Sequence, residues 1–282
     1  MITVIIPCYQ AEATLQATLD CIPKEVPIVA VNDGSTDSTK RILESAQGSH
    51  TLSIINHPAN LGLGAARNGG ILGANTDYVV FLDADDRLTD GFFPALIGFL
   101  TAHPESDWLY HPYKECLPSG KCRERQGQQP KSVEDLVTRH NPLSPSGAIL
   151  KRETLLQHGG FDTDRQLQGT EDLDLWARLI HAGLRPTQWS RTAYTLYRTR
   201  GGMTENVHLH AQKVAQRIRN MVAARMINRQ VEIHAMQELS RQVARTHHKA
   251  GRFAEAIKAY RLSPPSLKRG FLMLAAGLRR AI

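Results

Sequence analysis

The alternation of strand-like and helix-like segments in the first hundred residues most limits the folds open to this chain. Four short segments rich in Val and Ile alternate with segments whose apolar residues recur at helical spacing. Such strands, separated by helices, are typical of βαβ units, in which helices cover both faces of a parallel sheet. The four predicted strands are ITVIIP (2–7), IVAVND (28–33), TLSIIN (51–56) and YVVFLD (78–83).

The pattern changes after residue 103. A polar, proline-containing stretch at 104–145 precedes a well-marked helix, TEDLDLWARLIHAGL (170–184), which has acidic residues in its first turn. From about residue 205 nearly every segment is helical and basic. We therefore expect three parts, with a domain boundary near residue 205. These parts are residues 1–103, 104–204 and 205–282, and the strands expected in the second part are WLYHPY (108–113), GAILKR (147–152) and TAYTLYR (192–198).

The composition excludes several protein classes. The 282 residues are 41% hydrophobic and 22% charged, which is typical of a globular protein large enough to bury a core. With 21 Gly, 14 Pro and 4 Cys, the chain is neither collagen-like nor a disulfide scaffold. No apolar run approaches the ~20 residues of a membrane-spanning helix, and the N-terminus lacks the features of a signal peptide. We expect a cytoplasmic protein whose membrane contact, if any, is peripheral at the cytoplasmic face.

The net charge of +7 is unevenly distributed. Residues 1–100 hold 5 basic and 11 acidic side chains, whereas residues 201–282 hold 15 basic and 4 acidic ones. An acidic front is a poor nucleic-acid surface but can hold a cation. We expect no nucleic-acid partner, and we expect the basic C-terminal part to face an anionic membrane or an acidic partner.

The four cysteines do not indicate a secreted protein. Cys8 and Cys21 lie in apolar patterns and are expected to be buried thiols. Cys116 and Cys122 flank a turn-like segment and can pair if oxidised. We expect a reducing compartment, the cytoplasm.

Polar side chains follow three of the predicted strands. Pro7, Tyr9 and Glu12 follow the first, the Asn32–Ser35 turn follows the second, and the Asp83–Asp86 turn follows the fourth. Parallel strands bring such turns to one edge of a sheet, where ligands bind. An aromatic ring and a carboxylate can hold a nucleobase, and clustered carboxylates suit Mg²⁺ or Mn²⁺, which bridges phosphates.

Simpler interpretations of these residues stay open at this point. Asp33-Gly34 can be only a turn, and the Asp83–Asp86 acids can be solvated. Glu171-Asp172 can be present only to satisfy a helix N-terminus. A dinucleotide fingerprint is excluded, because Pro7-Cys8-Tyr9 stands where that motif needs glycines.

Five ordered segments resemble family 2 glycosyltransferases. They are VIIPCYQAEATLQATL, IVAVNDGSTDST, NLGLGAARNGGI, YVVFLDADD and LQGTEDLDLWARLIHAG, and together they cover roughly residues 1–200. The resemblance implies the GT-A fold: a Rossmann-like, mainly parallel sheet sandwiched by helices, here with a C-terminal helical extension. Residues 1–103 would then bind the nucleotide sugar and residues 104–204 the acceptor. The implied activity is transfer of a hexose or related sugar, with inversion, from a nucleotide diphosphate (most often UDP) to an acceptor hydroxyl, with Mn²⁺ or Mg²⁺.

The resemblance also implies roles for individual residues on the donor side. The segment from Asn60 to Asn68 would line the nucleotide pocket, with Arg67 and Asn68 supporting the loop more than contacting phosphate. Asp83 would face the ribose or the metal, and Asp85 would ligate the metal. The nucleotide-binding set is therefore Pro7, Tyr9, Glu12, Asp33, Asn60, Gly62, Arg67 and Asp83.

On the acceptor side, the resemblance makes Asp172 the general base, with Glu171 and Trp176 orienting the acceptor. A carboxylate in the first turn of a helix has a lowered pKa unless an apolar neighbour, such as Trp176 one turn on, offsets this effect.

The chain departs from the family in the loop after the last predicted strand. Many relatives have a histidine there that helps to bind the metal or the diphosphate, and Arg200 stands in its place. A guanidinium cannot ligate a metal but can pair with a diphosphate. We expect Arg198 or Arg200 to neutralise the leaving group.

Two classes of protein other than an active glycosyltransferase have this fold or a related one. A decayed GT-A scaffold or binding protein stays open because of Arg200. A sugar nucleotidyltransferase would need a Gly-rich, basic loop after the first strand, and PCYQAE is neither. The sequence leaves open the sugar, the nucleotide, the oligomeric state and whether the acceptor is a glycan, a lipid or a protein.

The basic C-terminal part contains two further patterns. Residues 244–264 resemble one helical hairpin of a tetratricopeptide-like repeat, with Gly251 at the turn and Ala254, Ala256 and Tyr260 packing. Residues 267–282 have an apolar face flanked by basic residues, which suits either an anionic membrane or a core-packed helix.

We predict that deleting residues 264–282 lowers association with liposomes that contain anionic lipid, because the deletion removes this basic, apolar segment. Co-sedimentation of the full and shortened chains measures the bound fraction. Equal bound fractions would reject the membrane role.

Overall fold

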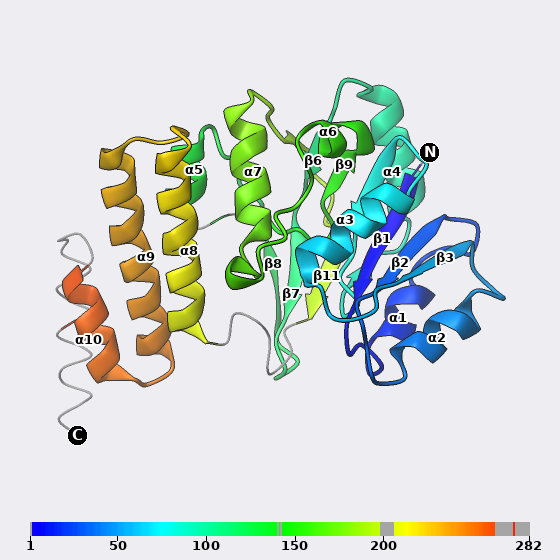
Figure 1. Cartoon of the computed structure of the whole chain (residues 1–282), viewed down its shortest axis with the longest axis horizontal. Helices are drawn as coiled ribbons and strands as arrows, with labels where there is room; N and C mark the ends of the chain where they lie inside the picture. The colour runs from blue at the N-terminus through cyan, green and yellow to red at the C-terminus, as the bar shows by residue number, and fades with distance from the viewer. Residues whose placement is uncertain (1, 140, 142, 198–205, 263–272, 274–282) are drawn as a thin grey trace. The chain divides into compact units, whose positions relative to one another are not determined.

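The computed structural model describes residues 2–139, 141, 143–197, 206–262 and 273. The chain forms two compact units, which are treated separately below (Figure 1). The first unit comprises residues 1–129 and 142–202, and the second comprises residues 130–141 and 203–282. The segment 130–141, which the sequence placed in the acceptor half, therefore belongs to the helical unit.

A seven-stranded sheet in the order β10-β6-β9-β4-β1-β2-β3 forms the centre of the first unit. Strands β1 to β4 pair in parallel, as predicted, and β9 runs antiparallel between β4 and β6. The α/β fold class is confirmed. The strands are β1 (Ile2–Cys8), β2 (Ile28–Asn32), β3 (Leu52–Asn56), β4 (Tyr78–Phe81), β6 (Trp108–Tyr110), β9 (Ile149–Lys151) and β10 (Thr187–Gln188).

A second, four-stranded sheet in the order β5-β11-β7-β8 was not expected as a separate element. The segment 108–113, predicted as one strand, is divided between the two sheets at His111 and Pro112. Proline ends the first ladder because it has no amide hydrogen to donate. The strands are β5 (Arg87–Leu88), β7 (Tyr113–Cys116), β8 (Cys122–Arg125) and β11 (Tyr194–Tyr197).

Helices cover both faces of the large sheet, as the buried strands require. Val4 and Ile6 of β1 belong to a core to which α1 and α4 contribute, whereas Val29 and Val31 of β2 pack with Ala66 of α3. The helices of this unit are α1 (Leu15–Asp20), α2 (Thr39–Ala46), α3 (Leu63–Gly73), α4 (Phe92–Ala102), α6 (Arg152–Gln157), α7 (Glu171–His181) and the 3₁₀ turn η1 (Arg165–Leu167).

Helix α3 approaches the sheet closely because glycines of this helix lie where it meets the strands. A Cβ atom added to Gly70 would lie 2.2 Å from Cγ2 of Ile5 in β1. The small residues of this helix therefore set the distance between α3 and the strand ends.

The second unit is helical. Helix α9 contacts α5, α8 and α10. The predicted hairpin is present, with Gly251 at φ +75° in the turn and Ala256 and Tyr260 buried against Ala244, while Ala254 is half-buried. The helices are α5 (Val133–Thr138), α8 (Val207–Ala223), α9 (Arg229–Lys249) and α10 (Phe253–Leu262).

None of the helices within the described ranges is long and apolar enough to cross a membrane. Apart from Met273, the segment 267–282 lies outside the described residues, so its contact with a membrane stays a prediction.

We predict that Gly70→Ala destabilises the protein by about 1–3 kcal/mol, the usual cost of overpacking a core. Gly98→Ala in α4 is the matched control. Apart from the neighbouring backbone of α4 itself, no described atom lies within 4 Å of the Cβ that this change adds. That change is expected to be neutral or to stabilise by up to about 1 kcal/mol. Urea denaturation measures both, and equal effects would contradict the packing of α3 on β1.

Candidate active site

Arg67 of α3 joins two segments that lie far apart in the sequence. Its Nη1 donates to Glu171 Oε1 and its Nη2 to Asp83 Oδ1, both at 2.9 Å. Its side chain is 1% exposed, and its guanidinium lies 5.2 Å from the centre of the Phe161 ring. Arg67 thereby holds the turn after β4 beside the first turn of α7. This agrees with a supporting role and leaves no exposed guanidinium for a nucleotide.

Asp172 follows Glu171 at the start of α7 and is only partly exposed. Burial, and then the negative charge of Glu171, raise the pKa of Asp172 to about 7. Arg67 and the backbone amides of Leu173 and Asp172 lower the pKa, but by less than burial and Glu171 raise it. The lowering expected from the helix N-terminus is therefore outweighed. A carboxyl with this pKa can accept a proton near neutral pH.

The acceptor-orienting roles assigned to Glu171 and Trp176 need correction. Glu171 is 2% exposed and uses both oxygens, one for Arg67 and the other for the amide of Gly169 at 2.6 Å. Trp176 has no exposed surface and stacks on Trp108, with ring centroids 4.6 Å apart. Both side chains therefore hold the start of α7 in place instead of facing a ligand.

The turn after β4 presents carboxylates of different exposure. Asp83, with 31% of its side chain exposed, and the partly exposed Asp85 can reach a ligand. Asp86 is 2% exposed and accepts a hydrogen bond from the Tyr197 amide at 3.0 Å. Burial raises the pKa of Asp86 well above its usual value, and Asp83 and Asp85 add to the rise. Within the described part of the chain, no group of three metal-ligating side chains gathers.

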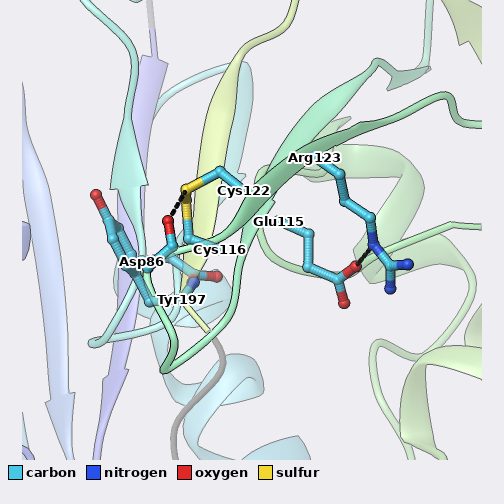
Figure 2. Close-up of a disulfide and its surroundings, with 7 residues drawn as sticks. Asp86, Glu115, Cys116, Cys122, Arg123 and Tyr197 are labelled. Carbon is cyan, nitrogen blue, oxygen red and sulfur yellow. Dashed lines mark hydrogen bonds and ion pairs between the residues drawn. A yellow bond between two sulfur atoms is a disulfide. The ribbon is translucent and has the colours of Figure 1, made fainter. Parts of the chain in front are cut away.

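Tyr197, which binds Asp86, is also the neighbour of a disulfide (Figure 2). Cys116 of β7 pairs with Tyr197 of β11 and is bonded to Cys122 of β8, so the expectation of reduced thiols differs from the structure. On the same hairpin, the buried Glu115 accepts hydrogen bonds from two arginines. Arg198 and Arg200, which follow Tyr197, lie outside the described residues.

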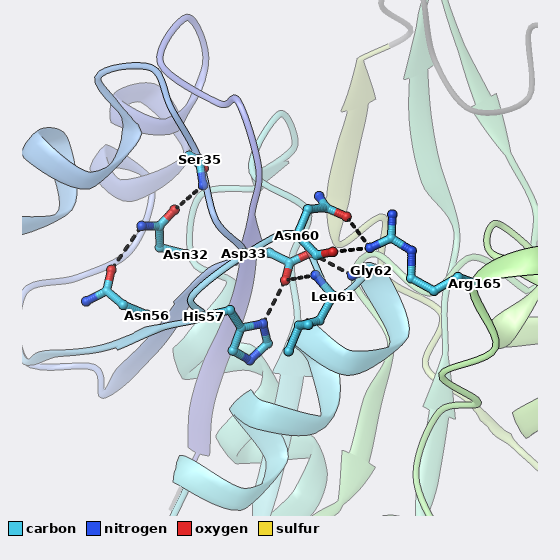
Figure 3. Close-up of polar contacts among 9 residues, drawn as sticks. All are labelled: Asn32, Asp33, Ser35, Asn56, His57, Asn60, Leu61, Gly62 and Arg165. Carbon is cyan, nitrogen blue, oxygen red and sulfur yellow. Dashed lines mark hydrogen bonds and ion pairs between the residues drawn. The ribbon is translucent and has the colours of Figure 1, made fainter.

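Asp33 organises the turn that follows β3 (Figure 3). Only 3% exposed, it accepts hydrogen bonds from the amides of Leu61 and Gly62, both at 2.9 Å, and lies 2.7 Å from Nδ1 of His57. The sequence interpretation missed His57, although its place directly after the third strand puts it at this sheet edge. In the structure Asp33 supports the loop, and its contact with a base or ribose stays a prediction.

The remaining donor-side residues differ in accessibility. Tyr9 is 53% exposed at the end of β1, whereas Pro7 is buried within that strand and places Tyr9. The exposed Glu12 accepts a hydrogen bond from the Ser38 amide at 2.9 Å. Asn60 bonds to Arg165, and Gly62 has the left-handed φ of +101° that begins α3. Of this group, Tyr9 and Glu12 are exposed, and Tyr9 offers an aromatic ring to a ligand.

Comparison with known proteins shows the family to which this chain belongs. The family model for glycosyl transferase family 2 matches residues 3–155, more than half of the chain. The chain belongs to glycosyl transferase family 2. The matched range includes the turns that carry Asp33 and Asp83 but ends before Asp172.

Among the relatives in this family, the pre-mycofactocin glycosyltransferase of Mycobacterium tuberculosis (strain ATCC 25618 / H37Rv) is 29% identical over 194 residues, which are 65% of this chain and 40% of that protein. The chain thus spans less than half the length of this curated relative. It is also similar in fold to S. aureus TarS in complex with UDP-GlcNAc, with a TM-score of 0.68 and 18% identity over 99% of this chain and 87% of that one.

A second solved structure, the mannosyltransferase PcManGT from Pyrobaculum calidifontis in complex with GDP-Man and Mn²⁺, gives a TM-score of 0.58 at 21% identity, over 99% of this chain and 80% of that one. The GT-A fold of family 2 is therefore confirmed for this chain.

The raised pKa of Asp172 predicts a pH-dependent effect of Asp172→Asn on stability. Between about pH 4 and pH 7 the native state retains a proton that the unfolded chain has lost, so this group makes the protein less stable as the pH rises through that range. The asparagine carries no such cost. We expect the Tm of Asp172→Asn to equal that of the wild type near pH 4 and to exceed it above pH 7.

Asp174→Asn is the control for this measurement, because Asp174 lies on the same helix but is paired with Arg178 at 2.8 Å. It is not expected to raise the Tm above pH 7. A Tm difference for Asp172→Asn that does not vary with pH would contradict the pKa assigned to Asp172.

Proposed function

We propose that this chain transfers a sugar from a nucleotide-diphosphate donor, a UDP-sugar, to an acceptor hydroxyl with inversion. The chemistry is a metal-assisted single displacement with Asp172 as general base. The observation that carries the proposal is the position of Asp172, whose pKa is about 7, beside the Arg67 bridge to Asp83. This brings a proton acceptor near the carboxylates expected to face the donor.

Each requirement of such a displacement has a candidate residue. The acceptor hydroxyl must lose a proton as the new bond forms, and Asp172, whose pKa is raised to about 7, can accept it. Arg67 keeps Glu171 paired, which prevents a second free carboxylate from forming next to the base. On the donor side, the exposed ring of Tyr9 can stack on the base, and Asp33 shapes the loop around it.

The residues of the turn after β4 fit a divalent cation. Asp83 and Asp85 offer hard carboxylate oxygens and are partly exposed, which suits Mg²⁺ or Mn²⁺ completed by water and substrate phosphates. Asp83 commits Oδ1 to Arg67, so Asp85 would be the principal ligand. When bound, such an ion would neutralise the charge that develops on the departing diphosphate. The complex of PcManGT with GDP-Man and Mn²⁺ supports this assignment.

The complex of TarS with UDP-GlcNAc supports UDP as the nucleotide. Arg198 or Arg200 would pair with the leaving diphosphate. We place the reaction in the synthesis of a surface glycan or glycoconjugate, at the cytoplasmic side of the membrane, with a glycan, lipid or protein acceptor.

We predict that Asp172→Asn lowers the rate of sugar transfer by about 10²–10⁴-fold, the usual contribution of a general base, while UDP binding is retained. In contrast, Asp85→Ala is expected to abolish Mn²⁺-dependent UDP binding. A thermal-shift screen of nucleotide sugars, with and without Mn²⁺, identifies the donor. Asp174→Asn is the control variant for the effect of Asp172→Asn on transfer.

Unchanged transfer by Asp172→Asn would reject the base, and unchanged Mn²⁺-dependent binding by Asp85→Ala would reject the metal ligand. If the wild type binds nucleotides but neither transfers nor hydrolyses any sugar donor, the chain is instead a decayed GT-A scaffold.

A further inference from the structure

Helix α3 and the loop before it contact the segment that leads into α7, residues 161–171, at several points. A Cβ atom added to Gly64 would lie 2.1 Å from the backbone oxygen of Asp162. The carboxamide of Asn68 donates to the oxygen of Phe161 at 2.7 Å and accepts from its amide at 2.8 Å. The buried pair of Arg67 and Glu171 completes this row of contacts. The donor-side helix and the segment that carries Asp172 are therefore fitted to each other.

The exposed end of this row is a contact between Arg165 and Asn60 (Figure 3). Nη1 of Arg165 donates to the backbone oxygen of Asn60 and, at 2.7 Å, to its Oδ1. A Cβ atom added to Gly62 would lie 3.1 Å from Oε1 of Gln168, so the η1 turn lies directly against this loop. Arg165 is exposed and Asn60 is half-buried, and both are polar, so core packing does not explain the contact.

The loop 57–62 has a separate anchor on its other side. Asp33 holds the amides of Leu61 and Gly62 and approaches His57. A Cβ atom added to Gly34 would lie 2.4 Å from the backbone carbon of Ala59, so the loop crosses closely over the turn after β2. Asp33 and the turn after β2 therefore hold the loop independently of its contact with Arg165. What Arg165 adds is the link from this loop to the segment that leads to Asp172.

We propose that Arg165 is a positioning residue for sugar transfer, which ties the donor-side loop 57–62 to the segment 165–172 and thereby sets the place of Asp172 relative to the bound donor. The inference rests on the proposed function. A misplacement of about 1 Å in an active site can cost about 10²-fold in rate, so a polar contact at the exposed end of the row can control the reaction without touching the substrate.

The test compares Arg165→Gln, Arg165→Lys and the control Arg185→Gln in the full chain. Arg185 is also exposed and also donates to backbone oxygens, of Ile180 and Leu184 at the far end of α7. We expect Arg165→Gln to lower kcat for transfer at least about tenfold, with the Kd for UDP and Mn²⁺ changed less than about twofold. Arg165→Lys should recover part of kcat, because an ammonium can still donate to Asn60.

A double-mutant cycle with Asn60→Ala tests the partner. If Arg165 acts through Asn60, the double variant should lose kcat by about the same factor as Arg165→Gln alone, whereas independent residues would multiply their losses. Multiplied losses would overturn the proposal.

Other results also decide between the claims. Arg165→Gln with the wild-type kcat, or with only a raised KM for the donor, would overturn the positioning role. A loss of kcat equally large in Arg185→Gln would do the same. A wild-type protein that turns over no nucleotide sugar would instead refute the proposed function itself.

Discussion

The two ion pairs of Arg67 are the interaction on which the rest of the site depends. One buried guanidinium holds Asp83, at the end of β4, and Glu171, at the start of α7, at 2.9 Å each. Removing one partner of a buried pair typically costs about 3–5 kcal/mol, because the other charge stays behind without water. The glycines of α3 allow this helix to approach the sheet closely, and Arg67 joins the turn after β4 to the start of α7.

This bridge explains the environment of Asp172. The burial that surrounds the bridge, together with the charge of Glu171, raises the pKa of Asp172, while Arg67 limits the rise. The pKa of Asp172 therefore depends on its buried surroundings and on the charges of Glu171 and Arg67. Asp33 has a similar supporting position, because it accepts hydrogen bonds from the amides of the loop 57–62. The ring of Tyr9 remains exposed and can contact a ligand.

The sequence predicted the elements whose pattern is local. Val- and Ile-rich runs set strands β1 to β4, and the acids after β4 and at the start of α7 were recognised by type and order. Burial and long-range pairing were not accessible in this way. Glu171 and Trp176 stand beside the base in the sequence yet face inward, and the contacts of Arg165 with Asn60 and of Arg67 with Glu171 join residues more than one hundred positions apart. His57 meets Asp33, and Asp86 meets the amide of Tyr197, only when the fold brings the strand ends together.

The most direct test of this account is a ¹³C NMR titration of the Asp172 carboxyl group in the wild type and in Glu171→Gln. We predict a midpoint near pH 7 in the wild type, because burial and Glu171 oppose ionisation. We predict a lower midpoint in Glu171→Gln, because a repulsive charge is lost and Arg67 is left with one fewer partner. A midpoint near pH 4 in the wild type, or one that does not move in the variant, would contradict the account.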